Sequence, residues 1–320
     1  MASEGFVMRR GVGLLLATAT LFPVGCNWIK SSGGTKTDTP TPKRSTPAEV
    51  RPAADYVAYL NRQAGYVQTV RYNDLNLSVS MPGQSVPGLN NGMVVCGKPN
   101  NFRMKAGLVA MGTQLDVGSN AQELWMYVKP SDPQYTFCSH ADFPKYQDAL
   151  PVKFEPAWVL QSLGMAEYDP TRRYEVQADA ARGAVYLKYP DVTANGDQVL
   201  KVTEFAASDM SGTAAPQVRR HVVLSPDGNR TIASATVTKV AEKTVGTDPV
   251  SGGSAVVKVP TEVTLEWPQQ KVKMDLQLGQ IVVNERMTQE LYDNLFRRPA
   301  EIRSAKPVNL ADAIRSMPRR

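Results

Sequence analysis

Histidine and cysteine are scarce in this sequence: its 320 residues include two histidines and three cysteines. A catalytic triad or a metal centre usually draws on several such side chains. His140 follows Cys138 by two positions and His221 stands far from both, so a metal site would be short of ligands. The sequence also lacks the short motifs of serine hydrolases, zinc proteases and dinucleotide-binding proteins. We therefore expect no enzyme, no metal and no other cofactor.

Long hydrophobic runs and a strong excess of one charge are missing as well. The apolar segment at residues 11–22 is too short to cross a bilayer as a helix. The net charge is +6, and no basic cluster is interleaved with aromatic side chains. A nucleic-acid partner is therefore not expected. A solvated surface with a slight basic excess accounts for the charge, and weak attraction to anionic lipid headgroups stays open.

The apolar segment has the features of an export signal. Arg9 and Arg10 precede it, and Pro23, Val24, Gly25 and Cys26 follow it. Small residues before a cysteine resemble a bacterial lipobox, although proline occupies the place where leucine is usual. We expect a signal peptide at residues 1–25 and lipidation of Cys26; a plain secretory signal that is cut elsewhere is the alternative.

The residues after Cys26 are rich in Thr, Ser, Gly, Pro and Lys and have almost nothing to bury. We interpret residues 26–47 as the lipidated cysteine and a flexible tether, residues 48–312 as one domain, and residues 313–320 as a basic tail. Flexible-coil statistics give such a tether a reach of roughly 25 Å. The domain would then work close to the membrane, in the bacterial cell envelope and facing the periplasm.

Two cysteines remain after the lipobox, Cys96 and Cys138. In an exported protein an even pair is compatible with a disulfide. Two buried thiols on neighbouring strands are the other interpretation.

Three segments have helical signals. Residues 46–65 place Thr46 and Glu49 as a capping box, with Pro52 able to delay the start. Residues 156–164 open on a proline and end on a glycine, and residues 287–296 space apolar side chains four apart before Pro299.

The rest of the domain alternates or runs apolar between Gly, Pro, Asn and Asp breaks, which predicts about a dozen antiparallel strands. A sheet of this size normally curls. We predict a mainly β fold with a few helices: an incomplete, strongly curved antiparallel β-barrel with a helical lid over its inner face.

Two stretches resemble the LolA/LolB lipoprotein-localisation family. Residues 97–106, GKPNNFRMKA, are similar to its Arg-Pro-x-x-Phe-Arg-Trp signature, and residues 260–301 are similar to its final strands, with an asparagine after the last strand. The resemblance implies a curved open sheet that binds lipid or lipoprotein acyl chains reversibly in an apolar cavity. It also implies that Arg103 acts as a latch, donating hydrogen bonds to the lid helices.

On this basis we expect an apolar lining that includes the following side chains near the signature: Phe102, Leu108, Leu115, Trp125 and Met126. Ordinary core packing is the competing interpretation. The functional alternative is a structural or sensory lipoprotein that contacts other envelope proteins and fills the cavity with its own side chains.

Overall fold

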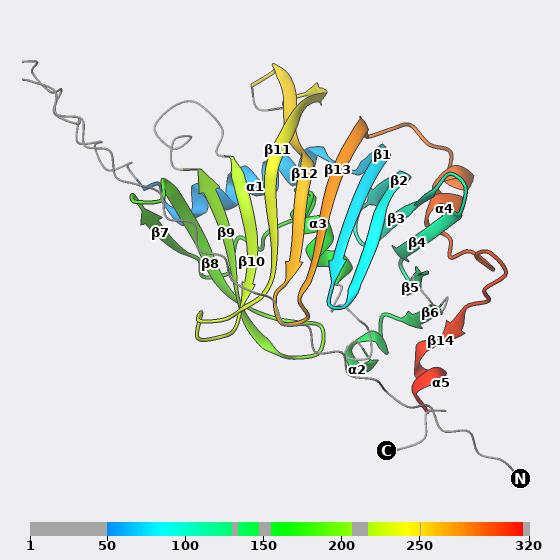
Figure 1. Ribbon diagram of the computed structural model, residues 1–320. Helices are drawn as coiled ribbons and strands as arrows, with labels where there is room; N and C mark the ends of the chain where they lie inside the picture. Colours follow the sequence, from blue (N-terminus) through cyan, green and yellow to red (C-terminus); the bar gives the residue numbers. More distant parts are fainter. Residues whose placement is uncertain (1–49, 130–133, 147–154, 207–216, 250, 316–320) are drawn as a thin grey trace, which may run out of the picture. The chain divides into compact units, whose positions relative to one another are not determined.

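The computed structural model describes residues 50–315 except 130–133, 147–154, 207–216 and 250 (Figure 1). Residues 45–320 form one compact unit. The predicted signal peptide, Cys26, the whole of the predicted tether and residues 316–320 of the predicted tail lie outside the described residues. Among the residues that are described, no helix has both the length and the apolar character to cross a membrane.

Fourteen strands of the described chain form one sheet. The strands of its first half are β1 (Thr69–Met81), β2 (Gln84–Gly97), β3 (Asn101–Leu108), β4 (Gly112–Ser119), β5 (Glu123–Val128) and β6 (Gln134–Ser139). The second half contains β7 (Glu175–Asp179), β8 (Ala184–Val192), β9 (Gln198–Ala206), β10 (Val218–Leu224), β11 (Thr231–Thr247), β12 (Ser254–Trp267) and β13 (Val272–Val283). The last strand is β14 (Val308–Asn309).

Two antiparallel meanders make up this sheet, and they meet at one long seam. Strands β1 to β6 pair in sequence, as do β7 to β13, and β1 then pairs with β13, with Leu75 opposite Leu278. The two-residue β14 pairs in parallel with β6 at one edge, while β7 forms the other edge. The sheet is therefore open, as the predicted incomplete barrel requires.

Five helices accompany the sheet in the described residues: α1 (Ala53–Tyr66), α2 (Phe143–Tyr146), α3 (Pro156–Ser162), α4 (Gln289–Phe296) and α5 (Leu310–Arg315). Three of them occupy the segments with helical signals. The first begins directly after Pro52, as the fixed proline backbone allows, and α3 opens on a proline. The short α2 and α5 were not predicted, and α5 crosses the boundary that we expected at residue 312.

The sheet curves around α3. This helix contacts both β3 and β10, which five other strands separate in the sheet order. We call the face that α3 contacts the inner face and the opposite one the outer face. The main hydrophobic core lies on the inner face between α3 and both meanders, and α1 packs on the same side of the sheet (Figure 1). A second core joins α1 to β8 and β9 through Tyr56 and Phe205, whose rings lie 5.0 Å apart.

The two cysteines correct one prediction. Cys96 on β2 and Cys138 on β6 are both free and buried, and they belong to different hydrophobic clusters. Three strands lie between β2 and β6 in the sheet, so the thiols are neither bonded nor on neighbouring strands. Neighbouring strands are about 4.8 Å apart, and four such steps exceed the reach of a disulfide.

Candidate functional site

The inner face is occupied by α3. Trp158, Val159 and Leu160 of the helix and Leu163 just after it are all buried in the main core. The indole of Trp158 meets the ring of Trp267 on β12 edge to face, with 5.6 Å between their centroids. The chain therefore fills the hollow of its own curved sheet with one short apolar helix.

Three cavities border α3. The largest, about 150 Å³, lies beside its first turn and is named here the Trp158 cavity. The His221 cavity, about 50 Å³, lies beside its last residues, and the Phe102 cavity, about 10 Å³, lies between the helix and strands of both meanders. Since all three touch the same helix, they would join if α3 moved away.

The Phe102 cavity is lined almost entirely by apolar side chains. Val159 and Leu163 form its helix side, and the sheet side comes from strands of both meanders. The sheet residues are Val94, Phe102, Met104, Val263, Leu265, Leu276 and Leu278. Its sheet residues come from β2, β3, β12 and β13, so it lies across the seam between β1 and β13.

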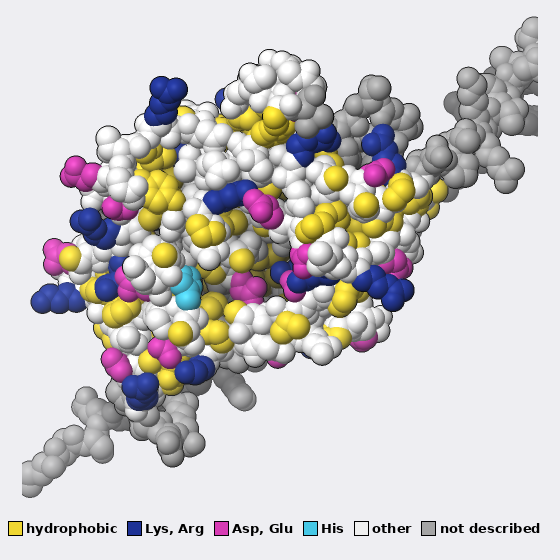
Figure 2. Space-filling view, turned by 180° about the vertical axis from the view of Figure 1, so that it is seen from behind, with side chains coloured by type: hydrophobic (Ala, Val, Ile, Leu, Met, Phe, Trp, Pro, Cys, Tyr) yellow, Lys and Arg dark blue, Asp and Glu magenta, His cyan; other side chains and the backbone are white. Residues whose placement is uncertain are grey.

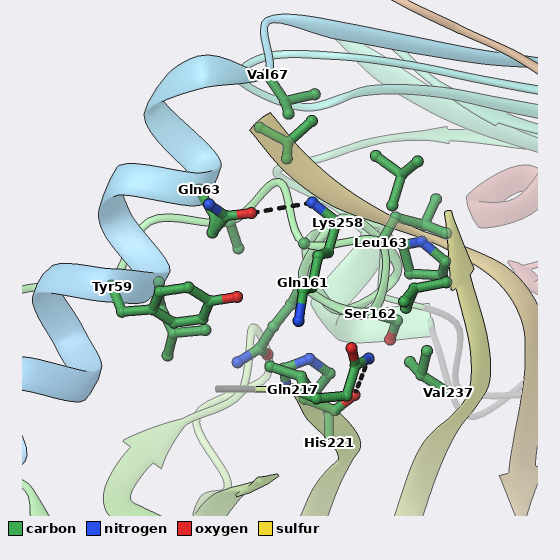
Figure 3. Close-up of a pocket in the computed structure, with 18 of the residues that line it drawn as sticks. Tyr59, Gln63, Val67, Gln161, Ser162, Leu163, Gln217, His221, Val237 and Lys258 are labelled. Atoms are coloured by element: carbon green, nitrogen blue, oxygen red, sulfur yellow. Dashed lines mark hydrogen bonds between the residues drawn. The ribbon is translucent and has the colours of Figure 1, made fainter. Parts of the chain in front are cut away.

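The His221 cavity has a polar base (Figure 3). Gln161 of α3 donates from Nε2 to the hydroxyls of Tyr168 and Tyr189, at 2.9 and 3.1 Å. Tyr168 is linked through Thr203 to Nδ1 of His221, over oxygen–oxygen and oxygen–nitrogen distances of 3.1 and 3.2 Å. This network satisfies buried polar groups and holds the end of α3 by directional bonds.

Burial fixes the charge state of His221. The side chain is 4% exposed, and loss of solvation, followed by repulsion from Lys201, lowers the pKa of His221 to about 4. The imidazole is therefore neutral at physiological pH and acts as a hydrogen-bonding partner of Thr203.

Helix α1 closes the other side of the His221 cavity. Gln63 accepts from the backbone N–H of Lys258 at 3.0 Å (Figure 3) and donates to the carbonyl of Val256 at 3.4 Å. At the end of the helix, Asn284 donates to the carbonyl of Tyr66 at 2.6 Å. Its side-chain oxygen also accepts from the backbone N–H groups of Gln68 and Thr69, where β1 begins. Asn284 is the asparagine of the second resembling stretch, and its position explains its use: it joins α1 to the end of β13.

Four of the five residues predicted to line the interior face it. Phe102 and Leu115 are buried in the main core, and Leu108 and Met126 pack against that core. Of these, Phe102 borders a cavity. The fifth residue, Trp125, belongs to an outer-face cluster with Tyr127, Tyr135 and Ile302. Adjacent strand residues point to opposite faces, so Trp125 and Met126 could not both line the interior.

Arg103 also lies on the outer face, which contradicts the latch predicted for it. Its guanidinium binds Asp116 through two hydrogen bonds, at 3.1 and 2.8 Å, and donates to the carbonyl of Leu295 at 3.2 Å. Leu295 is in the last turn of α4, where carbonyls lack helical partners. The arginine does bind a helix end as expected, but that helix is α4 on the outer face and not a lid over the cavities.

Further bonds hold the segment after α4 to the outer face. Arg298 forms an ion pair with Glu123 at 2.8 Å and lies over the ring of Phe137 at 3.9 Å. The hydroxyl of Tyr135 donates to the carbonyl of Pro299. We call residues 289–315 the C-terminal strap, since they cross β3 to β6 and end in β14 and α5.

The sequence interpretation missed several residues of the site. Trp158, Gln161 and Leu163 were recognised as parts of a helix but not as the filling of the inner face. A signal was present, because residues 156–163 contain no charged side chain, and a helix that is apolar on most sides is typically buried. His221 had no local signal, since only the pairing of β9 with β10 brings it to Thr203.

On the side shown in Figure 2, basic and acidic side chains are interspersed with apolar ones. In the part of the chain that the structure describes, no group of three or more His, Cys, Asp or Glu side chains could hold a metal ion.

Comparisons with known proteins give distant structural likenesses. No protein-family model and no curated protein sequence matches the chain. Similar solved structures include a Vibrio parahaemolyticus domain described as outer membrane lipoprotein-sorting, with 8% identity, a TM-score of 0.47, and coverage of 77% of this chain and 100% of that one. A LolA superfamily protein from Nitrosomonas europaea has 11% identity and a TM-score of 0.41, covering 76% of this chain and 97% of that one. Lipoprotein LppX from Mycobacterium tuberculosis has 11% identity and a TM-score of 0.24, covering 75% and 99%. At these scores the likenesses assign neither a ligand nor a partner to this chain.

Proposed function

We propose that this protein is a membrane-anchored envelope lipoprotein that binds acyl chains of lipids or lipoproteins in the space that α3 occupies. The observation that supports this most directly is the position of the apolar helix α3 on the main hydrophobic core of the inner face, with a cavity at each end and one beneath it. A role in moving lipids or lipoproteins within the envelope follows from such reversible binding.

The cavities alone are too small for a long acyl chain. An apolar cavity of about 150 Å³ accommodates a ligand the size of benzene, and the Trp158 cavity has about that volume. A long chain therefore requires the part of α3 that follows Trp158 to leave the inner face. We expect α3 to act as a removable plug that the ligand replaces.

Burial of α3 and burial of an acyl chain in its place give comparable free energies. Burying a large apolar side chain is worth about 1.5–3 kcal/mol, so exposing Val159, Leu160 and Leu163 would cost roughly 5–9 kcal/mol. A 16-carbon chain buries CH₂ groups worth on the order of 12 kcal/mol in total. Because the two figures are of the same order, exchange between plug and ligand can be reversible.

The proposed anchor rests on the lipobox-like sequence that ends in Cys26. Lipidated Cys26 would carry diacylglycerol on its sulfur and an acyl group on its amino terminus, and two or more chains hold a protein stably where one does not. We expect Cys26→Ser to release the protein from the membrane fraction or to leave its signal peptide uncleaved. A variant that fractionates and migrates like the parent would contradict the anchor.

A structural or sensory lipoprotein remains the second candidate, because the small cavities leave the interior largely filled by the protein's own side chains. Organic extracts of purified residues 45–320, analysed by mass spectrometry, distinguish the two. Co-purified lipid, or saturable uptake of a fluorescent fatty acid, supports the carrier. Absence of both would favour the structural role.

A further inference from the structure

The Trp158 cavity differs from the other two in having an apolar floor and a polar rim. Its floor consists of two indoles and four aliphatic side chains: Trp158, Trp267, Val199, Val223, Ile232 and Ala233. Its rim comes from the turns that join β8 to β9, β10 to β11, and β12 to β13, together with Glu155 before α3. An amphipathic ligand fits such a site with its apolar part inward and its polar part at the rim.

Two buried polar atoms at this cavity have no partner. Trp158 is 3% exposed, and its Nε1 has no hydrogen-bond acceptor among the described residues. Oε1 of Gln270 is also buried and has no hydrogen-bond donor among them. Both residues line the cavity. An unsatisfied buried polar group is unfavourable, so the site is arranged for a ligand that brings both an acceptor and a donor.

The rim carries charges of both signs. Lys201 and Arg230 are basic, and Glu155 and Asp197 are acidic. Lys201 is paired with Asp191 at 2.7 Å, while Arg230 makes no ion pair among the described residues. A purely anionic head would meet the two rim carboxylates, and a purely cationic head would meet the two bases. A head with both charges can orient its phosphate toward Arg230 and its ammonium toward the carboxylates.

We propose that the Trp158 cavity binds the zwitterionic head of a phosphoethanolamine lipid. Phosphate or ester oxygens of the lipid accept from Nε1 of Trp158, and its ammonium donates to Oε1 of Gln270. Trp158 stays on the sheet, and the acyl chain enters the space that the residues after Trp158 vacate, toward the Phe102 cavity. This inference rests on the proposed acyl-chain function and adds the class of headgroup.

The test is displacement of a fluorescent fatty acid from residues 45–320 by three ligands with the same acyl chain. These are lysophosphatidylethanolamine, lysophosphatidylglycerol and monoacylglycerol, with chain-free glycerophosphoethanolamine as a fourth arm. Hydrogen bonds to charged groups are stronger than neutral ones, so we expect the ethanolamine lipid to compete about tenfold better than the other two. The chain-free compound should not compete at matched concentration.

Variants at the rim test which side chains cause the preference for the ethanolamine lipid. Arg230→Gln should reduce the advantage of the ethanolamine lipid over monoacylglycerol to about twofold or less, because it removes the charged partner of the phosphate. Glu155→Gln should bring lysophosphatidylglycerol closer to the ethanolamine lipid. The matched control is Arg219→Gln on β10, an exposed arginine outside the cavity lining, which should leave all the ratios unchanged.

Each other outcome overturns the inference. Equal displacement by the three acyl ligands would contradict the headgroup site but would still support binding of acyl chains. Competition by glycerophosphoethanolamine as strong as that of its lysolipid would indicate a soluble ligand instead of a lipid. If neither the fatty acid nor any lysolipid bound, the proposed function would fail together with this site.

Discussion

The two faces of the sheet are covered in different ways. On the inner face α3 rests mainly on apolar contacts, with cavities around it and an indole N–H that has no acceptor among the described residues. On the outer face the C-terminal strap is held by charged groups with directional bonds, among them Arg103 to Asp116 and Arg298 to Glu123. Apolar contact depends on area and accepts substitutes such as an acyl chain, whereas a bidentate ion pair accepts few. The comparison indicates that the inner cover is exchangeable and the outer one is fixed.

The largest expected loss of stability comes from removing a buried charge on the outer face. Asp116 is 1% exposed and accepts from both Arg103 and Nε1 of Trp125. Asp116→Ala leaves the arginine without its partner, so we expect a loss of about 3–5 kcal/mol in urea unfolding. The exposed pair Lys239–Glu262 serves as control, and Glu262→Gln should change stability little. Similar small losses in both variants would mean that the outer face is not fixed by its buried charges.

A substitution that enlarges the cavities of the inner face should lower the stability of the protein and speed the entry of ligand. Leu163 borders both the His221 and the Phe102 cavities, so Leu163→Ala enlarges and joins them. We expect a loss of about 2–5 kcal/mol in unfolding free energy, with faster uptake of a fluorescent fatty acid. Leu187→Ala in the core between α1 and β8 is the matched control, since it should lose similar stability without faster uptake. Equal uptake by the two variants would contradict the plug.

Acid should weaken the His221 end of the interior. The imidazole titrates near 6.5 when unfolded and near 4 when folded, so between these values the unfolded chain binds more protons. The native state therefore loses about 3 kcal/mol as pH falls from above 6.5 to 4. His221→Gln should show a smaller difference in urea midpoint between pH 7.5 and pH 4.5 than the parent. An unchanged difference would place the imidazole in solvent.

The smallest effect concerns the two buried thiols, Cys96 on β2 and Cys138 on β6. Burial raises the pKa of Cys96 far above its usual range and, ahead of nearby carboxylates, raises the pKa of Cys138 to about 11. Native residues 45–320 should therefore react with no thiol reagent at pH 8, while the denatured chain should titrate both cysteines. A denatured chain with no titratable thiol would instead indicate a disulfide between Cys96 and Cys138.

Local signals in the sequence predicted much of this fold. Pro52 and Pro156 marked the starts of α1 and α3, and alternation predicted the long strands. The signals did not say which face of the sheet each helix covers, because that depends on chain segments far apart. Arg103 and Phe102 are adjacent and must face opposite ways, yet which of them faces the cavities follows from where α3 and α4 pack. The two-residue β14 and the polar link from Gln161 to His221 likewise exist only in the folded protein.

The seam between β1 and β13 has a consequence for how the protein folds. Its partners, such as Leu75 and Leu278, are roughly 200 positions apart, whereas most other strand pairs join neighbours along the chain. Closing so long a loop is entropically costly, so we expect each meander to form first and the seam to close last and slowly. The hollow that α3 fills is lined from both sides of that seam, so the binding interior would be the last part of the protein to come into existence.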